Sequence, residues 1–354
     1  MKKIITIVGA RPQFIKIPLI SQEIRKFAKE VVVHTGQHYD ANMSDIFFEE
    51  LGIPRPDYNL GIGSMERGEQ IKLMREKIKE VLVKEKPNLV VIYGDTNSTL
   101  AGAQAANQLN IPIAHIEAGM RSYNQEMSEE QNRVESDKVS ALLFCSTRSA
   151  MENLTKEGMT KGVFLTGDVM ADIQKKVSGD HDQLSILEEL SLKSKEYILA
   201  TVHRQANTDD ETNLSNIINA FNQIDETIIF PLHPRTKKYL EEYNLKLSDK
   251  IKVIEPLGYK EMIILEANAK LILTDSGGVQ KEAYLAEVPC ITLRNETEWT
   301  ETVDSGWNQL AGAETQKIVE LVKNYPTPKN HPDFLGDGEA YLKISQILKD
   351  YLKI

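Results

Sequence analysis

The chain has 354 residues, of which 41% are hydrophobic and 27% are charged, and its formal net charge is −10 at pH 7. This is the composition of an ordinary globular protein, and the length exceeds the roughly 250–300 residues at which a single core tends to divide. An acidic chain without a block of lysine and arginine argues against a nucleic-acid-binding surface. No apolar run is long enough to span a membrane or to serve as a secretory signal. We therefore expect two domains and neither nucleic acid nor membrane as a partner.

The first half alternates strand and helix patterns. Amphipathic helices are predicted at 18–29 and 70–85, where apolar residues recur on one face. Short apolar runs rich in β-branched residues predict strands at 4–8, 31–35, 89–93, 111–117, 141–145 and 163–166. Near-continuous apolar strands between such helices indicate a parallel sheet covered on both faces.

The second half repeats the scheme. A polar stretch, 175–194, separates the halves, and we place the boundary near Gly167–Asp168. The last segment, 339–354, is predicted to be a helix, although its pattern alone leaves open which half it packs on. Strands are predicted at 197–202, 227–232, 251–256, 271–275 and 290–294. The fold class is therefore α/β, with two Rossmann-like, doubly wound domains.

The two cysteines, Cys145 and Cys290, each lie in a strand-like apolar run. Two isolated cysteines predict neither a disulfide framework nor a zinc site. Buried thiols in a reducing compartment are the simpler interpretation. We therefore expect a cytoplasmic protein.

Polar residues gather where four predicted strands end, which is where open parallel sheets bind ligands. The stretches are GARPQFIK (9–16), YGDTNSTLAG (93–102), HIEAGMRS (115–122) and LTDSGGVQKE (273–282). The first lacks the glycines of a dinucleotide loop and the Gly-Lys-Ser/Thr of a P-loop, and offers the cations Arg11 and Lys16 instead.

The fourth stretch is the best phosphate-binding candidate. Ser276 can cap the next helix, Gly277 and Gly278 allow close approach of backbone, and the free N–H groups of a helix N-terminus attract an anion. Glu282 lies about one and a half turns further on, where it can accept hydrogen bonds from ribose hydroxyls. The alternative is a plain serine–glycine helix cap.

Carboxylates form a second candidate site. Asp95 and Glu117 end consecutive strands, and Glu129 or Glu130 opens a later helix. Neighbouring carboxylates in a partly dry site push their pKa values apart and divide acid and base roles. The alternative is that each merely caps or complements a helix N-terminus.

The histidines give weaker signals. His34 and His38 are four apart but are separated by a turn, so a metal site there is disfavoured. His203 and His233 follow strands in the second half and offer a cation or a proton donor, or else lie on surface loops. The signatures of hydride transfer, P-loop phosphoryl transfer, serine hydrolysis and zinc proteolysis do not occur.

Taken together, these motifs resemble the non-hydrolysing UDP-N-acetylglucosamine 2-epimerases. The blocks TGQHYDANMSDIFFEELGI, EEQNR, TLRNETEW and a late GDG run in the family's order with the four stretches above, over nearly the whole chain. The resemblance implies the GT-B type of fold, with the C-terminal helix returning to the first domain. The implied domains are 1–167 plus about 339–354, bearing the catalytic carboxylates, and 168–338, binding UDP.

The resemblance also implies the reaction. UDP-N-acetylglucosamine and UDP-N-acetylmannosamine are interconverted without metal, nicotinamide or other cofactor, by elimination of UDP to 2-acetamidoglucal and its re-addition. The product supplies surface polysaccharides. A homodimer, and a second UDP-sugar acting as activator, are further expectations.

The family's roles carry over to residues of this chain. Asp95, Glu117 and Glu129 match its catalytic carboxylates, and His203 matches the catalytic histidine near the phosphates. The substrate-binding set comprises Arg11, Lys16, Arg133, His233, Ser276, Gly277, Gly278, Glu282 and Arg294.

Three alternatives stay open. HYDANMSDIFFEELGI and TEW also resemble the branch that epimerises UDP-2,3-diacetamido-2,3-dideoxyglucuronic acid, whose extra carboxylate would need a cation such as Arg121, Lys281 or Arg294. A GT-B glycosyltransferase would share the fold but leaves the three carboxylates unexplained. An inactive UDP-sugar-binding protein is suggested by Ser128 and Ala206, where the family usually has proline and glutamate.

Overall fold

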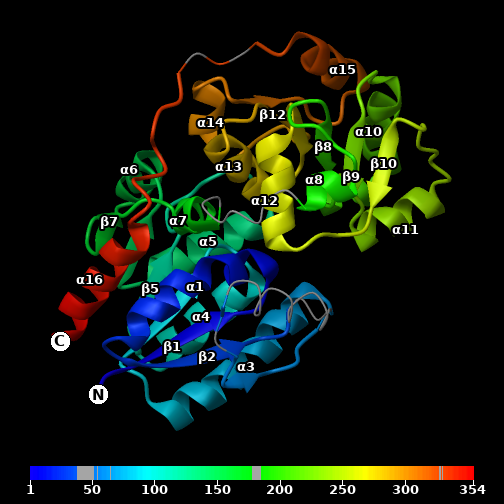
Figure 1. Cartoon of the computed structure of the whole chain (residues 1–354). Helices are drawn as coiled ribbons and strands as arrows, with labels where there is room; N and C mark the ends of the chain where they lie inside the picture. Colours follow the sequence, from blue (N-terminus) through cyan, green and yellow to red (C-terminus); the bar gives the residue numbers. More distant parts are fainter. Residues whose placement is uncertain (38–51, 54, 64, 178–184, 327, 329) are drawn as a thin grey trace. The chain divides into compact units, whose positions relative to one another are not determined.

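The computed structural model describes all residues except 38–51, 54, 64, 178–184, 327 and 329 (Figure 1). The chain forms two compact units, which we call unit 1 (Met1–Lys175 with Asp333–Ile354) and unit 2 (Lys176–Pro332). The sequence placed the divisions at 167/168 and near 338/339. The assignment of catalysis to one domain and UDP binding to the other stays a prediction.

Unit 1 is built on a parallel sheet of seven strands in the order β3-β2-β1-β4-β5-β6-β7. The order changes direction between β1 and β4, and the carboxyl ends beside such a point are where doubly wound sheets bind ligands. Six of the strands match the predicted runs, and the two-residue β3 was missed. The strands are β1 (Lys3–Val8), β2 (Lys29–His34), β3 (Tyr58–Asn59), β4 (Leu89–Tyr93), β5 (Ile113–Ile116), β6 (Leu142–Cys145) and β7 (Val163–Leu165).

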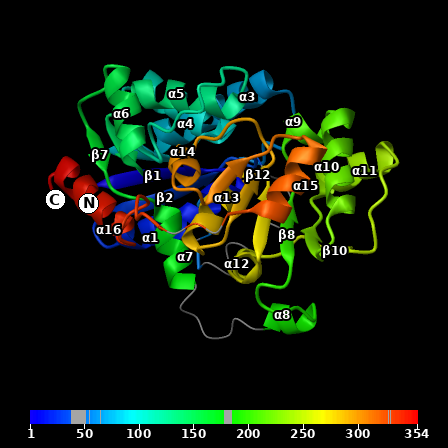
Figure 2. The ribbon, with the colours of Figure 1, turned by 90° about the horizontal axis from the view of Figure 1, so that it is seen from above.

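Helices cover both faces of this sheet. Figure 2 shows α3, α4 and α5 on one face and α1 and α16 on the other. Ile5 and Ile7 of β1 face a core shared with Met74 and Ile78 of α3, so alternate strand residues serve the two faces. The helices are α1 (Arg11–Arg25), α3 (Arg67–Glu85), α4 (Asn97–Gln108), α5 (Ser128–Val139), α6 (Arg148–Lys156), α7 (Val169–Val177) and α16 (Ala340–Leu352).

Helix α1 begins at Arg11, so the start predicted at residue 18 is wrong. Pro12 lies in the first turn, where the missing N–H would have no helical partner anyway. The side-chain oxygen of Gln13 accepts hydrogen bonds from the backbone N–H groups of Gly9 (2.8 Å) and Ala10 (3.1 Å), which stabilises the first turn. Pro18 then lies inside the helix instead of opening it.

The C-terminal helix α16 belongs to unit 1, as the resemblance implied. It packs on α1 and buries Ile344, Leu348 and Leu352. The backbone N–H of Tyr341, in its first turn, donates to the Asp172 carboxylate on α7 at 2.8 Å. Unit 1 is therefore completed by a helix that lies more than 150 residues after Lys175, where the first segment of the unit ends.

Unit 2 has a parallel sheet of six strands in the order β10-β9-β8-β11-β12-β13, which changes direction between β8 and β11. Five strands were predicted and β13 was missed. The strands are β8 (Ile198–Thr201), β9 (Ile228–Pro231), β10 (Ile251–Ile254), β11 (Leu271–Thr274), β12 (Cys290–Thr292) and β13 (Asn308–Leu310).

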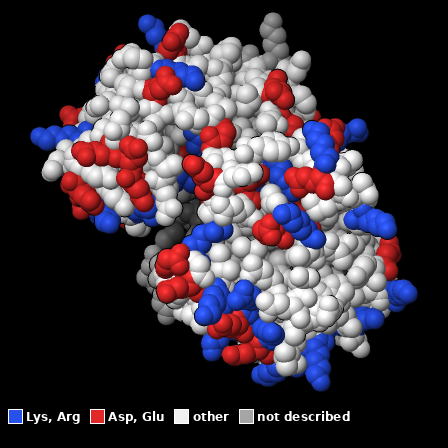
Figure 3. Space-filling view, turned by 180° about the vertical axis from the view of Figure 1, so that it is seen from behind, with Lys and Arg blue, Asp and Glu red and all other residues white. Residues whose placement is uncertain are grey.

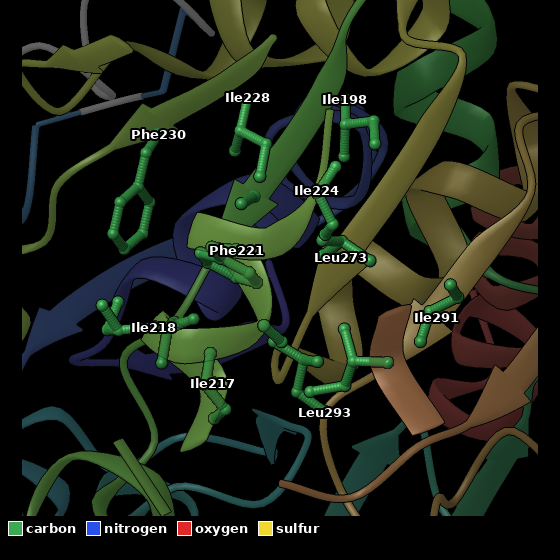
Figure 4. Packing of buried hydrophobic residues seen from close by; sticks show 14 of the residues in the cluster. Ile198, Ile217, Ile218, Phe221, Ile224, Ile228, Phe230, Leu273, Ile291 and Leu293 are labelled. Atoms are coloured by element: carbon green, nitrogen blue, oxygen red, sulfur yellow. The ribbon is translucent and has the colours of Figure 1, made fainter. Parts of the chain in front are cut away.

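One apolar core lies on each face of the unit 2 sheet. In Figure 4, Ile217, Ile218 and Phe221 of α10 pack against strand residues, and the rings of Phe221 and Phe230 meet edge to face with centroids 5.9 Å apart. The helices are α8 (Ser185–Glu189), α9 (Gln205–Thr208), α10 (Glu211–Gln223), α11 (Pro234–Glu242), α12 (Tyr259–Asn268), α13 (Gly277–Leu285), α14 (Thr300–Asp304) and α15 (Thr315–Asn324).

Charged side chains are mixed on the surface. Figure 3 shows lysine and arginine interspersed with aspartate and glutamate over the face in view. Within the described ranges, no helix combines the length and the apolar character needed to cross a membrane.

Candidate active site

The turn after β1 is held by close packing. A Cβ added to Gly9 would lie 1.9 Å from the Thr35 hydroxyl oxygen and 2.2 Å from that of Ser98, so only glycine fits there. The Gln13 amide also donates to the carbonyl of Tyr93 at 2.9 Å, which ties this turn to the end of β4. The glycine of GARPQFIK is therefore explained by packing, and the turn brings α1 to the edge of the sheet.

Lys16 of α1 and Glu117, directly after β5, form a buried ion pair. Their charged atoms are 2.6 Å apart, and the side chains are 5% and 8% exposed. Glu117 has a φ of +67°, a left-handed conformation that is uncommon for a residue other than glycine. The side chain of Arg11, by contrast, lies outside the described part of the structure.

Asp95, after β4, forms a second ion pair with the buried Arg133 of α5. Burial raises the pKa of Asp95 above its ordinary value, the Arg133 guanidinium opposes this rise, and the Glu117 and Glu129 carboxylates add to it. Asp95 is thus electrostatically coupled to both other predicted catalytic carboxylates. Lys16, Asp95, Glu117 and Arg133 come from two helices and two loops but form one cluster at the carboxyl edge of the unit 1 sheet.

The two glutamates in the first turn of α5, Glu129 and Glu130, have different partners. Glu130 is buried and accepts hydrogen bonds from the backbone N–H and the hydroxyl of Ser122, at 2.8 and 3.0 Å. Its role is therefore to hold the loop before α5. Glu129 accepts from the Ser128 hydroxyl at 3.0 Å and is the glutamate coupled to Asp95.

Sequence reasoning missed Asn132, which also holds the Asp95 segment. Its amide nitrogen donates to the Asp95 carbonyl at 2.9 Å and to the side-chain oxygen of Asn97 at 3.1 Å. Arg67 of α3 in turn donates to the Asn132 side-chain oxygen at 2.7 Å. An asparagine within the EEQNR block was a possible signal, but nothing in the pattern links it to the β4 turn.

In unit 2, the ends of β8 and β9 bring two predicted histidines together. The rings of His203 and His233 lie 5.4 Å apart between centroids. The buried Asp275, at the end of β11, accepts hydrogen bonds from the backbone N–H groups of His203 (3.1 Å) and Arg204 (2.9 Å). Asp275 was missed as a site residue, although it lies in the LTDSGG stretch.

The start of α13 has the features expected of an anion-binding helix N-terminus. Ser276 is its N-cap and accepts from the Val279 N–H at 3.4 Å. A Cβ on Gly277 would lie 2.3 Å from a carboxylate oxygen of Glu298, so glycine is required there too. Arg294 pairs with the same Glu298 at 3.1 Å. Gly278 and the buried Glu282 lie in the first two turns of α13.

The metal alternative gains no support. His34 is buried at the end of β2 and its ring stacks on Phe14 with centroids 5.1 Å apart. His38 and most of the block 35–53 lie outside the described residues. Among the residues that are described, no three His, Cys, Asp or Glu side chains are grouped so as to hold a metal ion.

Two doubly wound parallel-sheet units, one with a cluster of paired carboxylates and cations, define an α/β protein of the GT-B type. The family model of UDP-N-acetylglucosamine 2-epimerase matches residues 22–349. The chain therefore belongs to this family, and it is an epimerase, as the motifs indicated.

Relatives agree with this assignment. A "UDP-N-acetylglucosamine 2-epimerase homolog" of Methanococcus maripaludis is 54% identical, with 98% of this chain and 99% of the relative covered. The UDP-2,3-diacetamido-2,3-dideoxy-D-glucuronate 2-epimerase of Pseudomonas aeruginosa is 47% identical over the same shares. The Methanocaldococcus jannaschii UDP-GlcNAc 2-epimerase, solved in complex with UDP-GlcNAc and UDP, superposes with a TM-score of 0.93 at 43% identity, covering 99% of this chain and 100% of that one.

Proposed function

We propose that the chain interconverts UDP-N-acetylglucosamine and UDP-N-acetylmannosamine by eliminating UDP and adding it back. The observation that carries the proposal is the unit 1 cluster, in which ion pairs join Glu117 to Lys16 and Asp95 to Arg133, and Asp95 is coupled electrostatically to Glu117 and Glu129. Such a cluster suits proton transfer next to a departing anion.

The chemistry explains why both carboxylates and cations are needed. The C2 hydrogen of the sugar is not acidic until the C1–O bond to UDP begins to break. A carboxylate then takes the proton, the C2–H electrons form the C1=C2 double bond, and the C1–O electrons leave with UDP. In the return step a phosphate oxygen of UDP bonds to C1 and a proton is delivered to the opposite face of C2.

The two ion pairs suggest how the roles are divided. Asp95, whose pKa is raised by burial and by its acidic neighbours, suits the carboxyl that delivers a proton to C2. Glu117 faces the Lys16 ammonium and suits a carboxylate that accepts one. Lys16 and Arg11 are proposed to stabilise the charge that develops on the leaving diphosphate.

Unit 2 is proposed to supply the residues that bind UDP. The backbone N–H groups of Gly277 and Gly278 and the hydroxyl of Ser276 would bind a diphosphate oxygen, and Glu282 would accept hydrogen bonds from the ribose. His203 and His233 would donate to the phosphates, and Arg294 would add a positive charge.

The diacetamido uronate is a second candidate substrate, because the Pseudomonas aeruginosa relative that acts on it is 47% identical. Of the cations considered for its carboxylate, Arg121 is already engaged, since Glu157 binds it at 2.7 and 2.8 Å and its side chain is 1% exposed. Arg294 pairs with Glu298 at 3.1 Å and Lys281 lies 4.3 Å from the Trp299 ring centre, so all three cations already have partners and the experiment below decides between the sugars.

The remaining expectations are part of the proposal. Supply of surface polysaccharides, a homodimer and activation by a second UDP-sugar follow from the family resemblance. A cytoplasmic location is supported by Cys145 and Cys290, both buried free thiols whose pKa burial raises to about 12, so that neither is poised to react.

One experiment tests the proposal. The protein is incubated separately with UDP-N-acetylglucosamine and with the diacetamido uronate in deuterated water. Deuterium at C2 together with the C2-epimeric product supports epimerisation and identifies the substrate. Transfer of the sugar to an acceptor without exchange would indicate a glycosyltransferase, and binding without exchange or transfer would indicate an inactive UDP-sugar-binding protein.

A further inference from the structure

His115, in the middle of β5, bridges two segments from a fully buried position. Its Nε2 lies 2.7 Å from the carbonyl oxygen of Gly94, and its Nδ1 lies 2.7 Å from a carboxylate oxygen of Asp137 on α5. A carbonyl oxygen can only accept a hydrogen bond, so Nε2 must carry a hydrogen.

The ionisation of Asp137 bears on whether Nδ1 of His115 donates a hydrogen bond. Although burial raises the pKa of Asp137, hydrogen bonds and charge from His115 and Arg121 hold it below its ordinary value. When the Asp137 carboxylate is ionised it also only accepts, and the Nδ1 contact is then a second donated hydrogen bond. The charges balance, because Arg121 lies 2.8 Å from Asp137 and is bound in turn by Glu157.

The charged groups around His115 and Asp137 come from several neighbouring segments. Asp137 lies on α5, Arg121 on the loop after β5 and Glu157 at the end of α6. Cys145 of β6 also faces Asp137, but its pKa is raised to about 12, so it stays neutral. In the described part of the chain, the carboxylates of Asp137 and Glu157 therefore flank the side chains of His115 and Arg121.

The pair connects all three segments that bear the predicted catalytic carboxylates. Gly94, whose carbonyl it binds, directly precedes Asp95, and a Cβ on Gly94 would lie 3.5 Å from the Lys16 ammonium and 3.8 Å from a Glu117 oxygen. Asp137 also accepts from the N–H of Gly119, two residues after Glu117, at 3.1 Å. Helix α5 itself carries Glu129 near its start.

We propose that His115 is a positioning residue for epimerisation: its Nε2 holds Gly94 and thereby sets the spacing of Asp95 and Glu117, while its Nδ1 holds Asp137 and contributes less to that spacing. The inference rests on the proposed function, since it presumes that these carboxylates act on the sugar. Displacing a reacting group by about 1 Å can cost about 100-fold in rate.

Two substitutions test the Nε2 and Nδ1 hydrogen bonds of His115 separately. The amide nitrogen of His115→Gln can take the place of Nε2 and still donate to Gly94, whereas that of His115→Asn takes the place of Nδ1 and donates to Asp137 only. We expect His115→Asn to lower kcat about 100-fold with KM changed less than about 3-fold, and His115→Gln to lower kcat by about 10-fold or less. The midpoint temperature of thermal unfolding should be lowered by similar amounts in both variants.

His331 provides a matched control in unit 2, because its Nε2 likewise lies 2.8 Å from a carbonyl, that of Tyr284. His331→Asn should lose its hydrogen bond and leave kcat within about 2-fold. Equal losses of kcat in the two His115 variants, or an effect on KM alone, would reduce His115 to a structural residue and overturn the proposal.

A second measurement does not depend on activity. In the wild-type protein labelled with ¹⁵N-histidine, both nitrogens of His115 should give signals of protonated nitrogen while Asp137 is ionised, and Asp137→Asn should convert one of them to the unprotonated type. A neutral ring in the wild type refutes the inference even if epimerisation is observed. An imidazolium in a protein that never exchanges C2 hydrogen refutes the proposed function instead.

Discussion

The buried pair of Lys16 and Glu117 gives a prediction that separates stability from activity. With side chains 5% and 8% exposed and charged atoms 2.6 Å apart, each charge is compensated only while the other is present. Removing one partner of a buried pair typically costs about 3–5 kcal/mol, because the other charge remains buried. We therefore expect Lys16→Met and Glu117→Gln each to lower the thermal transition of unit 1 by about 6–20 °C, at about 2–4 °C per kcal/mol.

The double variant should be more stable than either single variant. Once both charges are gone, the desolvation cost of the remaining one disappears, and replacing a buried pair by uncharged groups is often neutral. Thermal unfolding followed by calorimetry measures the coupling through the double-mutant cycle. All three variants should still be inactive, because the proposal uses both groups in the reaction.

A surface pair serves as the control. Glu135 and Lys138 also lie 2.7 Å apart on α5, but their side chains are more than half exposed, so Glu135→Gln with Lys138→Met should change the transition by less than about 2 °C. If the effects of Lys16→Met and Glu117→Gln simply add in the double variant, the two charges do not compensate each other and the reasoning about this cluster is wrong.

Three further predictions concern the site and the fold. Asp95→Asn, Glu117→Gln and Glu129→Gln should each retain UDP binding by calorimetry and lose turnover by about 100-fold or more; near-normal turnover in all three would remove them from the mechanism. Gly277→Ala should weaken UDP binding about 10-fold or more, because its Cβ would lie 2.3 Å from a Glu298 oxygen, and unchanged affinity would argue against this helix start as the phosphate site. Burial raises the pKa of Asp172 to about 6, so the folded state binds this proton more tightly than the unfolded state. Stability from this group is present at about pH 4 and is lost as the pH rises through about 6, so Asp172→Asn should stabilise unit 1 by about 2 kcal/mol at pH 8 and remove that pH dependence in denaturant titrations; an unaltered dependence would contradict it.

The local sequence was sufficient to predict most of the strands and to indicate the family. The runs 4–8 and 89–93 are apolar or nearly so because parallel strands are buried on both faces, and that signal needs no tertiary information. The motifs at strand ends, including Asp95, Glu117 and Ser276–Gly278, could be found because parallel strands bring their carboxyl ends to one edge. The strands β3 (YN) and β13 (NQL) were missed because they are short and mostly polar, so neither shows an apolar run.

Only the tertiary structure decided which polar residues meet. The pattern could not distinguish Glu129 from Glu130, because one points to the carboxylate cluster and the other to the backbone of Ser122. Asn132, Asp275 and His115 act through partners 37, 72 and 21 residues away in the chain, and such pairings depend on how strands and helices pack. The start of α1 at Arg11 likewise depends on the Gln13 side chain, which binds the turn before the helix and the end of β4 at once.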